Sequence, residues 1–270
     1  MTSSAFAQSN TGRLLNISTR SRVQVDNQKF DTLVGGFIIT GGSKRVLVRG
    51  LGPSLSNRGI AQPLPDPLML LYRQNDVIAD NNNWADTQGS EIEATSVAPS
   101  NSFEAAIVRT LAPDGYTASI FSIAHDGLIA TGTALVEIYD LDPSSSGKLA
   151  NLSSRGVVGT GDDVMIGGLM VGQGSVKVLI RSIGPDLAVP TSSRLPDPIL
   201  EIYNTNGDII GSNDDWQQSQ RAAIEATTLA PRDTRDAAIL QTFAPGAYTA
   251  IVRGKNNTTG EATVEFYVVN

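Results

Sequence analysis

The sequence LNISTR at residues 15–20 returns as ANLSSR at 150–155, and GGFI at 35–38 returns as GGLM at 167–170. The correspondence continues to the end of the chain, pairing 46–53 with 178–185, 64–67 with 195–198, 92–95 with 224–227 and 136–139 with 264–267. The period of about 130 residues is far longer than a solenoid unit, so each copy has the size of a domain. The sequence therefore predicts an internal duplication.

The repeat divides the 270-residue chain into parts. We expect a signal-peptide remnant or an ordinary flexible N-terminus over residues 1–12, a first copy over 13–143 and a second copy over 144–270. The sequence PSSSG at 143–147 suits a short exposed linker. Each copy is expected to have a core of its own and to lie close to the other.

Composition excludes several classes of function. The chain contains no Cys and a single His, which excludes disulfides, thiolate chemistry and sites with several His ligands. That residue, His125, has no counterpart in the second copy, and we assign it no catalytic role. The 20 basic and 27 acidic residues give a formal charge of −7, which argues against nucleic acid as a partner. No apolar run approaches the roughly 20 residues of a membrane helix, so no membrane span is expected.

Short β-rich runs bounded by Gly, Pro and Asn predict an all-β fold of antiparallel sandwich type. In the first copy these runs cover residues 33–40, 45–49, 68–72, 106–111, 116–123 and 134–139. Asn206-Gly207 predicts a hairpin between its flanking strands, because it supplies the positive φ of a tight turn. Helices are expected only over 88–94 and 220–226. The doubled glycines predict either a bulge or a close approach of backbones.

Four stretches of the second copy carry a resemblance to a known type of module. They are DPILEIY at 197–203, NG at 206–207, NDDW at 213–216 and PGAYTAIV at 245–252. The sequence here resembles the bacterial pre-peptidase C-terminal (PPC) domains and related jelly-roll β-sandwiches, over roughly two-thirds of each copy. The resemblance implies two tandem antiparallel jelly-roll-like β-sandwich domains, non-catalytic and belonging to secreted or surface proteins, some of which bind calcium. The opening third of each copy is similar instead to duplicated modules of exported bacterial proteins of unassigned role.

The hairpin around Asn206-Gly207 predicts a cluster of oxygen ligands, because it brings the start of one strand opposite the end of the other. The candidate ligands in the second copy are Asp197, Asn213, Asp214 and Asp215. Those in the first copy are Asp66, Asp80 and Asn82. Oxygen ligands from loops suit Ca²⁺, and the smaller number of carboxylates predicts weaker binding in the first copy. The alternative is that these residues end strands and cap turns through local hydrogen bonds.

Trp84 and Trp216 occupy equivalent places beside these loops. Each ring is either an exposed platform for a sugar or an anchor that fixes the loop to the sandwich, and we favour the anchor because the chain is only 6% aromatic. The matched charged residues of the two copies are expected to form ion pairs rather than a catalytic pair of carboxylates. These residues are Arg49, Arg181, Glu93, Glu225, Glu104 and Asp236.

Two hypotheses of function follow from these patterns. The first is a secreted, non-enzymatic structural or adhesive module of the cell surface, which self-associates or binds other surface proteins, as in a filament. In that hypothesis the terminal strands at 14–19 and 264–269 add to the sheet of a neighbouring molecule. The second is a calcium-assisted carbohydrate-binding module with a polysaccharide partner. The sequence AFAQ at 5–8 is typical of the end of a signal peptide and favours secretion.

Overall fold

The computed structural model describes residues 12–26, 29–122 and 130–269, with the backbone alone over 24–31. Of the signal remnant expected over residues 1–12, residues 1–11 lie outside the described residues, as does the lone His125. Within that part of the chain, no helix has the length and apolarity needed to cross a bilayer. The chain is all-β with antiparallel strands, as the sequence predicts.

Apart from the short β2, the two halves of the chain contain the same strands in the same order. The first half contains the strands β1 (Leu14–Asp26), β2 (Lys29–Asp31), β3 (Leu33–Thr40), β4 (Lys44–Leu51), β5 (Pro67–Arg73), β6 (Asp76–Asn81), β7 (Ala105–Leu111), β8 (Asp114–Ser122) and β9 (Gly132–Asp140). The second half contains β10 (Lys148–Val158), β11 (Met165–Val171), β12 (Val176–Ser182), β13 (Pro198–Tyr203), β14 (Ile209–Asn213), β15 (Ala237–Phe243), β16 (Gly246–Gly254) and β17 (Gly260–Val268). The helical elements are η1 (Pro53–Arg58), α1 (Ala85–Glu93), η2 (Thr191–Ser193), η3 (Trp216–Gln218), α2 (Arg221–Glu225) and η4 (Lys255–Asn257).

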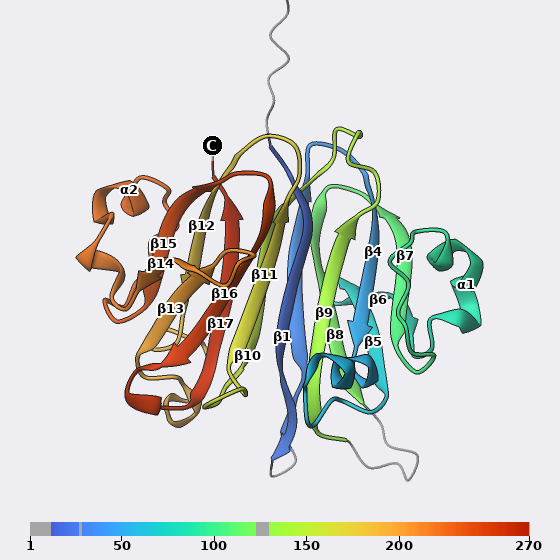
Figure 1. Ribbon diagram of the computed structural model, residues 1–270, viewed down its shortest axis with the longest axis horizontal. Helices are drawn as coiled ribbons and strands as arrows, with labels where there is room; N and C mark the ends of the chain where they lie inside the picture. Colours follow the sequence, from blue (N-terminus) through green and yellow to red (C-terminus); the bar gives the residue numbers. More distant parts are fainter. Residues whose placement is uncertain (1–11, 27–28, 123–129, 270) are drawn as a thin grey trace, which may run out of the picture.

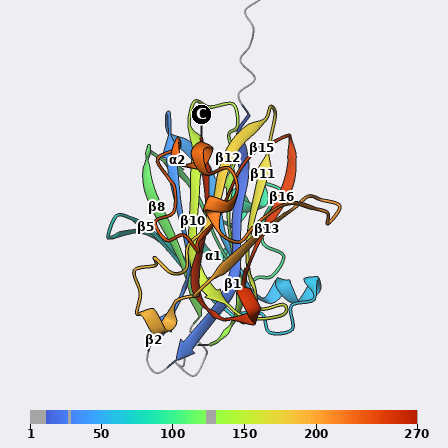
Figure 2. The same ribbon diagram turned by 90° about the vertical axis from the view of Figure 1, so that its left-hand side faces the viewer.

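The described strands pair in two long runs that pack face to face in a sandwich-like arrangement. One run has the order β7-β4-β9-β1-β11-β16-β13-β14. The other has the order β6-β5-β8-β3-β10-β17-β12-β15. Figure 2 shows the layers edge-on, with β5 and β8 on one side and β11 and β16 on the other. A single pairing of Arg22 with Val157 joins the two runs through β1 and β10.

The first strand of each half pairs with both halves of the chain. β1 pairs with β9 of its own half and with β11 of the other, and β10 pairs with β17 and with β3. Figure 1 shows β1 and β10 in the middle of the molecule, with α1 and α2 at opposite ends. The connection between the halves, at the expected boundary 143–144, therefore joins two parts that share both sheets. The inner core is also shared, because one contiguous cluster of buried side chains runs from Leu14 to Phe266 through both halves.

The strands β1 and β11, and the strands β10 and β3, pair where the two halves meet, and we call this place the seam. The recurring sequence motifs lie there. Ser18 and Thr19 of the first motif pair with Gly168 and Gly167, and in the symmetric arrangement 153–154 of β10 pair with 35–36 of β3. The ladder is regular at the glycines, so of the two expectations the close approach is observed. A Cβ on Gly35 would lie 2.8 Å from Val136, and one on Gly167 would lie 2.6 Å from the ring of Phe266. Both neighbours belong to the opposite layer, so these glycines let the two layers approach each other.

Neither terminal strand offers a free edge. β1 and β17 each have a partner on both sides, so the backbone groups at 14–19 and 264–268 are already used in the chain's own sheets. The expectation that these segments add to a neighbour's sheet is wrong for this reason. The outermost strands are β6, β7, β14 and β15.

Two of these outer edges are covered by glutamine side chains. Val108 of β7 donates its N–H to Oε1 of Gln88 at 3.1 Å and accepts from Nε2 of Gln88 at 2.9 Å. Leu240 of β15 makes the same pair of bonds with Gln220, at 3.0 and 2.8 Å. Each glutamine thus bonds the edge as a further strand would, which blocks strand addition at that position.

The close approach at the seam predicts that the two halves unfold together. Gly167→Val places methyl groups where the ring of Phe266 lies, and overpacking of this kind costs about 1–3 kcal/mol. Because the sheets are continuous, we expect one calorimetric transition, shifted as a whole to lower temperature. Gly115→Val is the matched control, since nothing lies within 4 Å of a Cβ on Gly115. Two separate transitions, with one unaffected by the substitution, would contradict the prediction.

Candidate functional site

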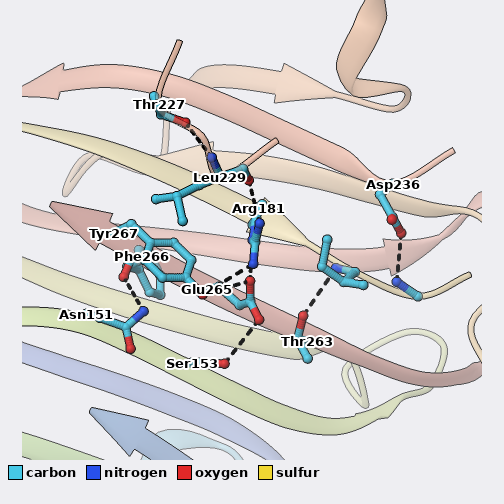
Figure 3. A network of polar contacts seen from close by, with 12 residues as sticks. Asn151, Ser153, Arg181, Thr227, Leu229, Asp236, Thr263, Glu265, Phe266 and Tyr267 are labelled. Atoms are coloured by element: carbon cyan, nitrogen blue, oxygen red, sulfur yellow. Dashed lines mark hydrogen bonds and ion pairs between the residues drawn. The ribbon is translucent and has the colours of Figure 1, made fainter. Parts of the chain in front are cut away.

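Arg181 lies at the centre of a polar network on the outer face of the second half. Its Nε bonds Glu265, its Nη1 bonds the carbonyl of Leu229, and its guanidinium lies 4.9 Å from the ring centre of Tyr267. Figure 3 shows that Ser153 of β10 joins the same network by donating to Glu265 Oε1, at 3.1 Å. Arg181 therefore fixes the loop after α2 to the sheet, next to the seam.

The first half repeats this arrangement. Arg49 Nε donates to Glu137 Oε2 at 2.6 Å, Nη1 donates to the carbonyl of Val97, and Nη2 donates to the hydroxyl of Tyr139 at 3.0 Å. Burial raises the pKa of Tyr139 to about 12, and the nearby Glu137 contributes to the rise. Arg49 and Arg181 therefore form ion pairs, as expected from the sequence. Their partners, Glu137 and Glu265, are not among the matched acids named in that expectation.

The matched acids Glu104 and Asp236 have a different role. Both are fully buried, and each bonds backbone N–H groups rather than a cation. Glu104 Oε1 accepts from the N–H groups of Gly52 and Ser54, at 3.0 and 2.9 Å, and from the hydroxyl of Ser54. Asp236 Oδ1 accepts from Gly184 N at 2.9 Å.

Asp236 has one oxygen with no partner among the described residues. This atom, Oδ2, is buried and accepts no hydrogen bond. Burial raises the pKa of Asp236 to about 7, and the negative charges of Asp233 and Asp186 act in the same direction. Ser54 of the first half corresponds to Asp186 here, so the second half replaces a hydroxyl donor with another acid.

Two of the four predicted calcium ligands of the second half lie beside a lysine. Lys255 Nζ lies 2.6 Å from Asp214 Oδ2 and 3.4 Å from Asp197 Oδ2. The other carboxylate oxygens of both residues, Oδ1, are buried and have no hydrogen-bond partner in the described chain. Burial raises the pKa of Asp197, against the effect of Lys255, and Asp214 and Asp215 raise it further.

The remaining predicted ligands make local hydrogen bonds. Asn213 is buried, with its amide bonded to the carbonyl of Asp215 and its Oδ1 accepting from Ala238 N at 2.9 Å. Asp215 accepts from the side chain of Gln218. Local hydrogen bonds of this kind are what we expect if Asn213 and Asp215 end a strand and cap a turn. Across residues 12–26, 29–122 and 130–269, no group of three or more His, Cys, Asp or Glu side chains is arranged to hold a metal.

The first half does not gather its three predicted ligands into a cluster. Asp80 and Asn82 are exposed, while Asp66 is half-buried with its Oδ1 inaccessible and unbonded. Within the described part of the chain, no hydrogen bond or ion pair joins these residues. The neighbour Asn81 takes the place of Asn213, since its Oδ1 accepts from Ala106 N at 2.9 Å.

The two tryptophans lie against the sheets as anchors. The Trp216 side chain is buried among Leu179, Ile224, Ala238 and Leu240, and its Nε1 donates to the carbonyl of Asp233 at 3.1 Å. A ring that is only 4% exposed has no free face for a sugar, so the platform interpretation is wrong for Trp216. Trp84 is half-buried and donates to the carbonyl of Asn101 at 3.2 Å.

Comparison with known proteins does not assign the chain to a family. No protein-family model matches the chain, and no curated protein matches it. One solved structure, described as "Structure of PNGF-II in P21 space group", aligns with a TM-score of 0.19 and 6% identity over 96% of this chain. The chain spans 57% of the length of that protein, and a score this low establishes no shared fold.

The raised pKa of Asp236 predicts a pH-dependent contribution to stability. The folded state holds a proton that the unfolded state releases near its ordinary pKa of 3.8, so this group's contribution falls as the pH rises toward about 7. Asp236→Asn should therefore destabilise the protein most near pH 4.5. The difference in free energy of unfolding between the variant and the native protein should then shrink as the pH rises to 7.5. Urea denaturation across this range measures the difference.

A second variant tests the cause of the raised pKa. Asp186→Ser restores the residue of the first half and removes one negative charge near Asp236. The pH at which the native protein and Asp236→Asn diverge should then move to a lower value. A free-energy difference that is the same at every pH would contradict the buried-acid interpretation.

Proposed function

We propose that the chain is a secreted, non-enzymatic structural or adhesive module of the cell surface, built from two tandem jelly-roll-like units that arose by internal duplication. The strand orders β1-β9-β4-β7 and β3-β8-β5-β6 support the fold, because eight-stranded jelly rolls are double sheets made of two Greek keys. The second half repeats both orders. The resemblance to PPC domains supports the same class of module.

One observation carries the proposal of a structural role. The charged and polar residues that recur in both halves bind backbone groups and hold loops to the sheets, as Arg49 and Arg181 do at Val97 and Leu229. Recurring residues are thus used for rigidity. A rigid double sandwich with two of its four outer strands bonded by glutamines is suited to presenting loops or faces to a partner.

The route of assembly follows from the paired strands. The terminal strands are interior, and Gln88 and Gln220 cover the outer edges of β7 and β15. We therefore propose that self-association, or binding of other surface proteins, uses faces and loops of the sandwich rather than strand addition.

Surface location and assembly can be tested together. Antibody detection in fractionated producing cells should find the chain in the surface or extracellular fraction, and static light scattering should show association that increases with concentration. Gln88→Ala with Gln220→Ala opens two edges and should add further association, whereas the exposed Gln74→Ala should not. Protein confined to the cell interior, together with a strict monomer at every concentration, would refute the proposal.

The second candidate is a calcium-assisted carbohydrate-binding module, and the two buried, unbonded Oδ1 atoms of Asp197 and Asp214 favour it. Two nearby carboxylates with free oxygens attract a cation, and Lys255 supplies one positive charge there. Calcium and Lys255 then compete for the same two carboxylates.

Isothermal titration with calcium chloride tests the second candidate. Lys255→Ala should bind calcium more tightly than the native chain, and Asp214→Asn should abolish the heat. Arg221→Ala serves as the control, since its partner is the exposed Glu225. Absence of heat in both the native protein and Lys255→Ala would exclude calcium at this cluster.

A further inference from the structure

A cavity of about 580 Å³ opens at the seam between the two halves. Three arginines line it: Arg20 and Arg22 from β1, and Arg58 from the end of η1. Ile60 and Gln62 follow in the same wall. Figure 1 shows η1 in front of the lower end of β9, beside β1. The cavity is within the range of about 300–1,000 Å³ that is usual for small-molecule sites.

The donors of these arginines are largely unused. Among the described residues, no hydrogen bond engages the guanidinium of Arg20 or Arg58. Arg22 approaches Asp163 only to 3.8 Å, which is too long for a hydrogen bond. Each guanidinium carries five N–H donors in a planar fork that fits a carboxylate. Burial lowers the pKa of Arg20, against the opposing effect of Asp162 and Asp163, as expected for a cation withdrawn from water without a close partner.

The symmetric place in the second half differs. By strand register, Arg20 corresponds to Arg155, Arg22 to Val157, and Thr133 to Glu261. Arg155 there faces Glu261 at 3.9 Å, whereas the first half has two arginines and a threonine. Val157 shows that β10 pairs regularly without an arginine at this position, so strand pairing alone does not account for Arg22.

The acids in the wall define the rest of the ligand. Asp162 and Asp163 come from the loop between β10 and β11, and with Gln62 and Thr133 they supply acceptors and donors suited to hydroxyl groups. Ile60 and Ala61 add an apolar surface. An anion alone would meet repulsion from the two acids, whereas a carboxylate surrounded by hydroxyl groups satisfies both kinds of side chain.

We propose that this cavity binds a hexuronic acid unit of an acidic polysaccharide, with its carboxylate on Arg20 and Arg22 and its hydroxyl groups on Asp162, Asp163 and Gln62. Arg58 lies at the open side, where it meets the ligand's charge. The site uses neither the tryptophans nor the aspartates of the calcium hypothesis. Its test is therefore independent of whether the chain is a surface module.

Titration calorimetry with an oligomer of glucuronic acid, and with the glucose oligomer of the same linkage, tests the proposal. The native chain should bind the uronic acid oligomer and not the neutral one, with weaker binding at high salt. Arg20→Gln with Arg22→Gln should weaken binding about tenfold or more, because charge-assisted hydrogen bonds are lost. The matched control is Arg155→Gln, at the symmetric place, which should bind as the native chain does.

Other outcomes overturn the proposal. Equal binding of the neutral oligomer, sulfate binding of the same affinity and variant dependence, or full binding by the folded double variant would each do so. Thermal unfolding reports whether each variant is folded. If the double variant fails to fold, Arg58→Gln at the exposed end of η1 carries the test, and unchanged binding in that variant would count against the site.

Discussion

The pairing of β1 with β11, and of β10 with β3, is the constraint on which the rest of this structure depends. Each half contributes its first strand to a seam with the other, so the two layers extend through the whole molecule. A single buried cluster fills the space between them. The close approach at the seam requires residues without side chains in the facing strands, which is why Gly35 and Gly167 recur. The boundary between the two copies in the sequence therefore does not divide the sheets, whose hydrogen bonds continue from one half to the other.

Rigid edges follow from the same arrangement. Strands at the ends of each run expose backbone groups, and these would pair with other chains if they were left open. Gln88 of α1 and Gln220, just before α2, bond such groups of the outer strands, while Asn81 and Asn213 bond Ala106 and Ala238. The Asn-rich loops therefore hold the ends of the sheets in place, which accounts for Asn213 without any metal.

The class of fold and many strand positions could be predicted from the sequence, because alternating apolar residues and turn signals are local properties. The run 33–40 is β3, and Asn206-Gly207 forms the turn between β13 and β14, with Gly207 at a φ of 83°. The pairing of β1 and β10 with strands of the other half could not be predicted. A strand paired within its own half has the same sequence pattern as one paired with the other half. Lys255 was missed for a similar reason: it lies far in sequence from Asp214, and only the fold brings the two together.

Departures from the internal symmetry separate residues that the fold requires from residues that call for another explanation. Lys44 and Asp140 form a buried ion pair where the second half has Val176 and Val268, but Lys44 also bonds the carbonyl of Asp142 in the connection, which occurs only once. Connectivity therefore explains that difference. Asp214 replaces Asn82, and its added charge is balanced by Lys255. Arg22 replaces Val157, and neither strand pairing nor a short ion pair accounts for it, because its contact with Asp163 is long, at 3.8 Å. Three arginines and two aspartates line this cavity, so one positive charge is in excess there, and a carboxylate ligand would offset its cost to stability.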